Sequence, residues 1–493
     1  MDFEGFATET DQLFASVLSK IFGFFFREIH SINDFIIWLQ KKLIPFTLIV
    51  GLILIVIIIV IRRIRAGTIK GYKEPGTKGL KKNRNKDRVL GIFLGKDRNK
   101  YVFSPIQKEE HILLFGRTGI GKTTCFIIQT LLSWVKKGTA LVFEIAGDIR
   151  KNIPDANSIV YEPESPDNNV RYNVFGPIDM LRTNVKKDQA LDALASLIIP
   201  IVKNDGSQSA YYRNFGRDIL SAALKAFYSV GMDFIDICKA ICFNDYYILF
   251  DMIESTGHLN AIKSVMSFRR VQGNFISGAK QVIDMALRIY VADSDLINSI
   301  GRGSTDVIGL EPQMLEEHII YISVSDSKHE LYRSFFDLIA GQYMDYFSSR
   351  KATRKSMPIL FCLDELSSFG HLDILPALRK YRKHKIRVMA ATQSLADLEL
   401  NYGKTERTAL IDNFGLIAVL SATDPDTQDY LARMIGKKTV FRKNTTIGSS
   451  NTTSDIEAKD WIIEPTDFAH LDSNYILIHP HGFAKLRKVP FYR

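Results

Sequence analysis

The stretch HILLFGRTGIGKTT, residues 111–124, is the most informative part of this sequence. It predicts a short apolar strand, then a glycine-rich loop, then the start of a helix. The pattern G-x-x-x-x-G-K-[ST] is matched without a mismatch by Gly116, Gly121, Lys122 and Thr123. In such a loop, backbone N–H groups wrap a phosphate, the lysine reaches the outer phosphates, and the threonine hydroxyl binds Mg²⁺. A chance match in a glycine-rich turn is the alternative, and the flanking strand and helix disfavour it.

A second candidate stretch, PILFCLDELSSFGHL, covers residues 358–372. An apolar run leads directly into Asp364 and Glu365, so we expect a strand that ends in carboxylates beside the phosphate-loop strand. Asp364 can hold Mg²⁺ and Glu365 can polarise an attacking water. The alternative is that the two acids only mark where the strand meets solvent. The phosphate loop in the same chain favours the catalytic interpretation.

Two further features follow the carboxylates. The apolar run IRVMAATQS, residues 386–394, ends in Gln393, which is either a turn residue or a sensor of the γ-phosphate. Six of the ten residues in LRKYRKHKIR, 378–387, are Lys or Arg. Such a run is usually a solvated helix face. Because the run lies between the two candidate strands, one of its arginines could instead act on the phosphate of a neighbouring subunit. Arg382 is the first candidate for this role and Arg379 is the second.

Apolar strand candidates alternate with helical runs after residue 100, which predicts an α/β fold with a largely parallel sheet covered on both faces. The candidates are 111–116, 139–145, 158–162, 318–324, 358–364, 386–392, 415–421 and 475–479. Between residues 177 and 302 the strand pattern disappears and helical spacing replaces it, so we expect an inserted all-α domain. Residues 442–455, RKNTTIGSSNTTSD, predict a polar loop.

The N-terminal region predicts a membrane anchor within residues 1–66. Residues 43–61 are 19 residues without a charge, long enough to cross a bilayer as a helix. The stretch 13–39 is a weaker candidate, either a first span or an amphipathic helix at the interface. From Arg62 to Lys100 there are fourteen Lys or Arg against three acids, which places the chain from about residue 62 in the cytoplasm. This basic run suits an anchor to anionic lipid, and a nucleic-acid contact is a compatible alternative.

Length and cysteine content agree with this organisation. At 493 residues, two or three domains are expected. Outside residues 62–100 the chain is close to neutral, although its formal net charge is +10. The four cysteines suit a reducing compartment, and Cys238 and Cys242 are better explained as helical thiols than as half of a metal site.

Taken together, these residues resemble the type IV coupling proteins of conjugation and secretion, the TraD/VirD4-like family. The most specific block is LDELSSFGHLDILPALRKYRKHKIRVMAATQSLADLELNYG, residues 363–403. Supporting blocks are RYNVFGP at 171–177 and SAYYRNFGRDILSAAL at 209–224. The resemblance implies a RecA-like P-loop NTPase domain, residues 67–176 and 303–493, an inserted all-α domain, 177–302, and an N-terminal transmembrane anchor.

The resemblance also implies a function and a set of site residues. It implies a hexameric, inner-membrane ATPase that uses ATP and Mg²⁺ to deliver relaxase-bound single-stranded DNA, or effector proteins, to a type IV secretion channel. The nucleotide loop would comprise Gly116, Arg117, Thr118, Gly119, Gly121, Lys122, Thr123 and Thr124. Thr123 and Asp364 would hold the metal. The catalytic set would be Lys122, Asp364, Glu365, Arg382 and Gln393, with Arg382 at the position of the arginine finger.

Two departures from the family pattern stand out. Family members often carry Asp-x-x-Gly-[Asp/Glu] after the second strand, whereas Glu144 replaces the leading Asp here. The chain ends at Arg493 without the long tail of some members, so we expect the all-α domain to select substrates.

Two other functions stay open. One is an FtsK-like or other membrane-bound DNA translocase, and the other is a substrate-recruiting scaffold with weak ATPase activity.

Overall fold

A computed structural model describes residue 41 and residues 76–145, 147–153, 157–165, 169–201, 206–446 and 452–492. Both predicted membrane spans, within 13–39 and at 43–61, lie outside these residues and stay predictions. Within the described part of the chain, no helix combines the length and apolar character that crossing a membrane requires. The described residues divide between two compact units, one with the sheet and most helices and one with the segment Lys437–Asp460.

A twelve-stranded sheet forms the centre of the larger unit, in the order β1-β3-β2-β16-β15-β12-β4-β11-β10-β5-β9-β6. The strands are β1 (Lys81–Asn83), β2 (Gly91–Asp97), β3 (Lys100–Pro105), β4 (Ile112–Phe115), β5 (Thr139–Ile145), β6 (Ser158–Tyr161), β9 (Ile319–Val324), β10 (Ile359–Leu363), β11 (Ile386–Thr392), β12 (Leu416–Val419), β15 (Asn474–His479) and β16 (Gly482–Arg487). All eight strands predicted from the sequence are present. The seven strands from β12 to β6 are parallel, and those from β15 to β1 are antiparallel.

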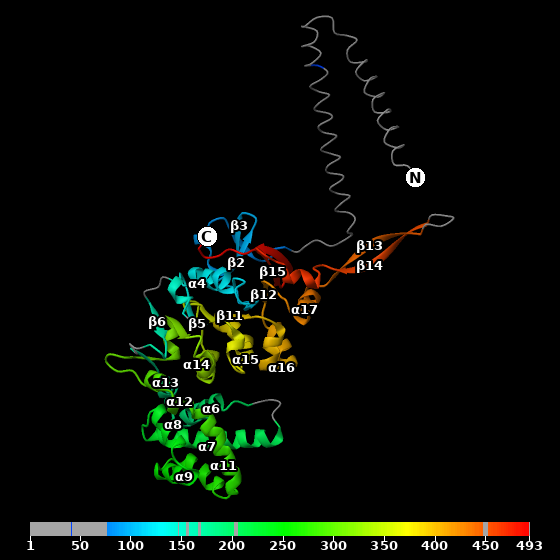
Figure 1. The fold of residues 1–493 in the computed structure, drawn as a ribbon. Coiled ribbons are helices and arrows are strands. Elements are labelled where there is room, and N and C mark those ends of the chain that lie inside the picture. Colours follow the sequence, from blue (N-terminus) through cyan, green and yellow to red (C-terminus); the bar gives the residue numbers. More distant parts are fainter. Residues whose placement is uncertain are drawn as a thin grey trace, which may run out of the picture. The chain divides into compact units, whose positions relative to one another are not determined.

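Helices cover both faces of the parallel part (Figure 1). On one face lie the π-helical turn η3 (Thr123–Ile127) and α4 (Ile128–Trp134), which form one continuous helix after the phosphate loop. On the other lie α14 (His329–Ser348), α15 (Leu375–Lys380) and α16 (Leu395–Asp412). Side chains of β10 contact both layers of helices, because successive side chains of a strand point to opposite faces of the sheet. Cys362 joins the core beneath α4, whereas the ring of Phe361 packs against Phe347 and Tyr381.

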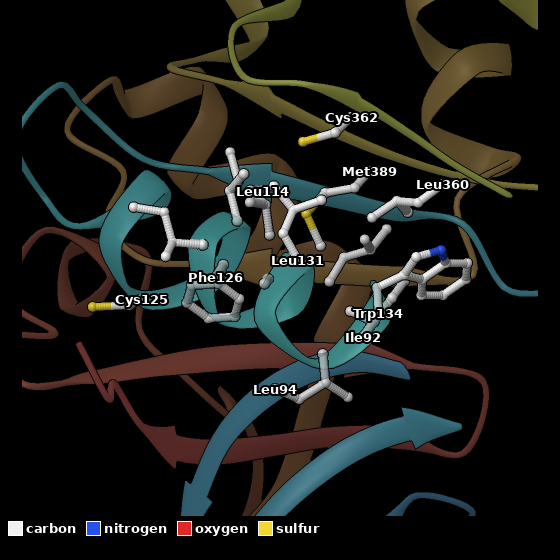
Figure 2. Close-up of a cluster of buried hydrophobic side chains, with 14 of the residues drawn as sticks. Ile92, Leu94, Leu114, Cys125, Phe126, Leu131, Trp134, Leu360, Cys362 and Met389 are labelled. Carbon is white, nitrogen blue, oxygen red and sulfur yellow. The ribbon is translucent and has the colours of Figure 1, made fainter. Parts of the chain in front are cut away.

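The helix after the loop is buried along almost its whole length. Figure 2 shows Phe126, Leu131 and Trp134 between sheet residues such as Met389 and the β2 residue Leu94. Phe126 and Trp134 have no exposed surface, and truncation of such a residue to alanine costs about 3–5 kcal/mol. The helix that carries the phosphate loop is therefore held from both sides by packing.

Consecutive helices separate β7 (Val170–Tyr172) from β8 (Ile308–Leu310), which pair with each other in a small parallel sheet. They are α5 (Gly176–Asp179), α6 (Asn184–Ile198), α7 (Ser207–Ser229), α8 (Phe234–Cys242), α9 (Tyr246–Ser255), α10 (Leu259–Phe268), α11 (Gly273–Leu287), α12 (Ile289–Ala292) and α13 (Ser294–Ser299). The described residues between β7 and β8 include no strand. The helical segment expected from the spacing is present, and helix α17 (Pro425–Ile435) follows later in the chain.

The prediction of a polar loop at 442–455 is wrong for residues 442–446 and 452–455, and the residues between them lie outside the described part of the chain. Strands β13 (Lys437–Thr446) and β14 (Thr452–Trp461) pair with each other as a two-stranded sheet. The stretch has four threonines, which favour extended backbone, but it has no apolar alternation. Periodicity detects strands that bury one face, and a polar ribbon gives no such pattern.

Candidate nucleotide-binding site

The predicted phosphate loop connects β4 directly to the buried helix. Its first glycine is pinned to the sheet, since the Gly116 N–H donates to the carbonyl of Thr392 at the end of β11 (3.1 Å). On the other side, the Arg117 N–H donates to the Ser421 hydroxyl just after β12 (3.4 Å). The loop therefore lies across the carboxyl ends of three neighbouring strands, where ligands of parallel sheets bind.

Glycine is required at three points of the loop. Gly119 and Gly121 have φ angles of 77° and 100°, a region that side chains strongly disfavour. A Cβ atom at Gly116 would lie 2.8 Å from the Ile120 side chain and 3.2 Å from that of Leu420. Arg117, Thr118 and Gly119 are exposed, so the backbone of this part of the loop can be reached by a ligand.

The helix brings Thr123 to the end of β10. The Thr123 hydroxyl donates to Asp364 Oδ1 (3.0 Å), which places a hydroxyl and a carboxylate in contact. These are the oxygen ligands that Mg²⁺ prefers when it binds together with substrate phosphates. Among the described residues, no cluster of three or more His, Cys, Asp or Glu side chains is suited to a metal ion. The pair fits a metal that takes its remaining ligands from a nucleotide and water.

Lys122 and Glu365 meet beside this pair. The Lys122 ammonium donates to the Gly116 carbonyl (2.6 Å) and lies 3.5 Å from Glu365 Oε2. Glu365 Oε1 accepts a hydrogen bond from the Ser367 hydroxyl (2.7 Å), which holds the carboxylate in place. Ser367 was not expected from the sequence. A hydroxyl two residues after a strand-end acid is the local signal that could have identified it.

Burial shifts the pKa of both carboxylates upward. It raises the pKa of Asp364, although the Thr123 hydrogen bond and the Lys122 charge oppose the shift. It also raises the pKa of Glu365, again against Lys122. A carboxylate with a raised pKa accepts a proton more readily, which suits a general base.

Glu144 adds a third carboxylate, which is buried at the end of β5. Its Oε2 accepts the backbone N–H groups of Ile149 (2.9 Å) and Arg150 (3.1 Å), so the side chain organises the turn after the strand. Burial raises the pKa of Glu144, and the charge of Asp364 acts in the same direction. The residue that departs from the family pattern therefore lies near the carboxylate pair.

The prediction that the strand ending in Asp364 and Glu365 lies directly beside the phosphate-loop strand is wrong. Strand β11 lies between β4 and β10, so the carboxylates are one strand removed from the loop. The strand that ends in Gln393 is the direct neighbour instead, and the Gln393 side chain is exposed at its tip. The loop, Gln393 and Asp364 thus lie on three consecutive strands. The order of these strands in the sheet differs from their order in the chain, where β10 precedes β11. The sequence therefore did not reveal that β11 lies between β4 and β10.

Arg382 lies at the opposite end of the sheet. It is on the 3₁₀ turn η7 (Tyr381–His384), immediately before β11, and donates to the Asn413 carbonyl (3.0 Å). Its charge helps to lower the pKa of His111 to about 3, an effect due mainly to burial, and His111 directly precedes β4. The four residues of β4, about 13 Å, separate this end from the loop. Arg382 therefore does not join the site of its own chain.

Comparison with known proteins identifies the family of this chain. A profile of the type IV secretion-system coupling protein DNA-binding domain matches residues 101–466. Protein VirD4 of Rhizobium rhizogenes is 23% identical over 431 residues, which cover 82% of this chain and 62% of VirD4. This chain thus spans about three fifths of the length of that relative.

The fold is similar to solved structures of the plasmid coupling protein TrwB. The unbound monoclinic form of the bacterial conjugative coupling protein TrwBdeltaN70 has a TM-score of 0.64 at 18% identity, with 78% of this chain and 86% of that chain covered. TrwB in complex with ADP and Mg²⁺ has a TM-score of 0.63 at 17% identity, with coverage of 82% and 89%.

The fold and the site define an α/β protein with a phosphate-loop sequence at the carboxyl end of a largely parallel sheet. More specifically, the chain belongs to the type IV coupling proteins of the VirD4/TraD family.

Proposed function

We propose that this protein is a membrane-anchored ATPase that drives relaxase-bound single-stranded DNA, or effector proteins, into a type IV secretion channel. The observation that carries the proposal is the convergence of Lys122, Thr123, Asp364 and Glu365 from elements some 240 residues apart. Family membership supports the transfer role, and the nucleotide complexes of TrwB support ATP and Mg²⁺ as ligands.

Each site residue has a role in this proposal. Bound ATP and Mg²⁺ would supply the phosphoanhydride and a positive charge that offsets charge developing on the phosphates. Thr123 and Asp364 would hold the metal, and Lys122 would turn from the Gly116 carbonyl to the outer phosphates. Glu365, held by Ser367, would accept the proton of the attacking water. Gln393 would sense the γ-phosphate at the tip of β11.

The assembly is part of the proposal. We propose that residues 67–176 and 303–493 form a RecA-like domain, that 177–302 form a substrate-selecting all-α domain, and that 1–66 anchor the chain in the bacterial inner membrane. The chain from about residue 62 would then lie in the cytoplasm. Because Arg382 lies far from the loop of its own chain, it can act only on a neighbour's nucleotide, which a hexameric ring provides.

The test is ATP turnover by the intact chain with and without single-stranded DNA. We expect DNA to stimulate turnover together with a shift from monomer to hexamer. Lys122→Ala should abolish turnover and transfer, whereas Lys137→Ala, an exposed lysine beyond the same helix, should leave both unchanged. Normal transfer by Lys122→Ala would contradict the motor function. Turnover that DNA does not stimulate would favour protein export.

A further inference from the structure

The segment Lys488–Tyr492, which follows β16, returns to the phosphate loop. The Phe491 N–H donates to the carbonyl of Thr124, the residue after the proposed metal ligand (3.0 Å). The Gln129 side-chain amide donates to the carbonyls of Val489 and Pro490 (3.0 Å each). Three hydrogen bonds therefore hold the segment against the helix that begins at the loop.

Charged and ionisable groups of the loop also influence the pKa of Lys488 in this segment. The pKa of the half-buried Lys488 is lowered mainly by burial, and the charge of Arg117 in the loop contributes in the same direction. The thiol of Cys125 acts on Lys488 in the opposite sense. Lys488 is therefore influenced by residues from both ends of the loop, by Arg117 directly after Gly116 and by Cys125 directly after Thr124.

Sheet order shows which end of a nucleotide would face this segment. A metal in such a site offsets charge on the outer phosphates, so Thr123 and Asp364, which would hold it, would mark the outer-phosphate end. In the sheet, β10 with Asp364 lies on one side of β4, and β16 lies on the other. The sugar and base would then extend from the loop away from Asp364, toward the side of β16 and the segment after it.

Tyr492 has a side chain suited to a base. It is 67% exposed, and its ring packs edge-on against that of Phe491, with centroids 5.3 Å apart. Phe491 itself is partly buried against the core, so the Tyr492 ring contacts a residue that is packed in the fold. An aromatic ring stacks on any base, because every base has a π-face.

We propose that Lys488–Tyr492 form the base-side wall of the nucleotide site, and that the Tyr492 ring stacks on the nucleobase. The proposal rests on the nucleotide binding proposed above. Since stacking does not read the hydrogen-bonding edge of the base, this wall favours adenine and guanine nucleotides alike.

The test compares ligands with and without a base by calorimetric titration of the intact chain. For Tyr492→Ala we expect the Kd for ATP and for GTP to rise about tenfold, the loss typical of one stacked base. The Kd for inorganic tripolyphosphate, which has no base, should not change. Tyr492→Phe keeps the ring and should bind ATP as the wild type does. Tyr247→Ala, a 59% exposed tyrosine on α9, is the matched control and should have no effect.

Two outcomes would overturn the assignment. One is an unchanged Kd for ATP in Tyr492→Ala, and the other is an equal loss of ATP and tripolyphosphate, which would indicate a disturbed loop. A wild-type chain that binds neither ligand would overturn the nucleotide site itself, and this wall with it. The tripolyphosphate titration therefore separates failure of the base contact from failure of the proposed function.

Discussion

The Thr123 hydroxyl donates a 3.0 Å hydrogen bond to Asp364 Oδ1, across 241 residues of sequence. The contact joins the helix after the phosphate loop to the end of β10. It forms because both residues lie at the carboxyl edge of one parallel sheet, and it brings together a hydroxyl and a carboxylate, groups that would suit Mg²⁺.

Loss of the Thr123 hydroxyl should raise the Mg²⁺ requirement. Thr123→Ala removes one proposed ligand and the hydrogen bond to Asp364, so we expect the Mg²⁺ concentration for half-maximal ATP turnover to rise about tenfold. Thr123→Ser keeps the hydroxyl and should restore most of the wild-type dependence. The measurement is ATP turnover titrated with Mg²⁺. An Mg²⁺ dependence in the alanine variant equal to that of the wild type would argue against a metal at this pair.

Arg382 should act across a subunit boundary. Its position at the far end of β4 predicts that Arg382→Ala keeps nucleotide binding but loses turnover. Mixing this variant with Glu365→Gln should restore part of the activity, because some interfaces then combine an intact arginine with an intact Glu365. Lys383→Ala, on the same turn, is the control and should keep full turnover. Absence of rescue at every mixing ratio would contradict the role in trans, and Arg379→Ala is then the next variant to measure.

Gln393 should matter for hydrolysis rather than binding. Because it lies at the tip of the strand between the loop and the carboxylates, we expect Gln393→Ala to lower kcat by at least about tenfold with little change in the Kd for ATP. Gln208→Ala, an exposed glutamine on α7, should change neither. Steady-state turnover and calorimetric titration measure the two quantities. A loss confined to Kd would show that Gln393 contributes to binding only.

Asp337 on α14 should make stability depend on pH. Both of its carboxylate oxygens accept the Gly370 N–H (3.0 Å each), and burial raises its pKa to about 6. The unfolded value is about 3.9, so the folded chain binds the proton more tightly between these pH values. Stability is therefore lost as the pH rises from about 4 to about 6, and the loss persists above it. A pKa shift of this size lowers the free energy of unfolding by at most about 3 kcal/mol.

The variant Asp337→Asn isolates this contribution. At pH 4 it should match the wild type, and at pH 7.5 its thermal unfolding midpoint should be a few degrees higher. Asp345→Asn, an exposed position on the same helix, should show no such pH-dependent difference from the wild type. A midpoint for Asp337→Asn below that of the wild type at pH 7.5 would mean that the charged carboxylate stabilises the fold.

The sequence predicted the parallel strands well and the antiparallel ones poorly. Strands such as β5 and β11 are buried on both faces and therefore form continuous apolar runs. In contrast, β16 with the sequence GFAKLR exposes Lys485 and Arg487, and it is too short and too polar to stand out. The ribbon β13–β14 gave no apolar pattern at all.

The phosphate-loop sequence, the strand-end acids, Gln393 and the long helical segment could be predicted from the sequence, because each depends on local pattern and residue chemistry. Which strands are neighbours in the sheet could not be predicted in the same way. In the folded chain, β11 lies between β4 and β10. Arg382 lies at the far end of the sheet, and the segment Lys488–Tyr492 contacts Thr124. The physical reason is that strand order depends on the packing of buried faces over the whole chain, which no local stretch contains.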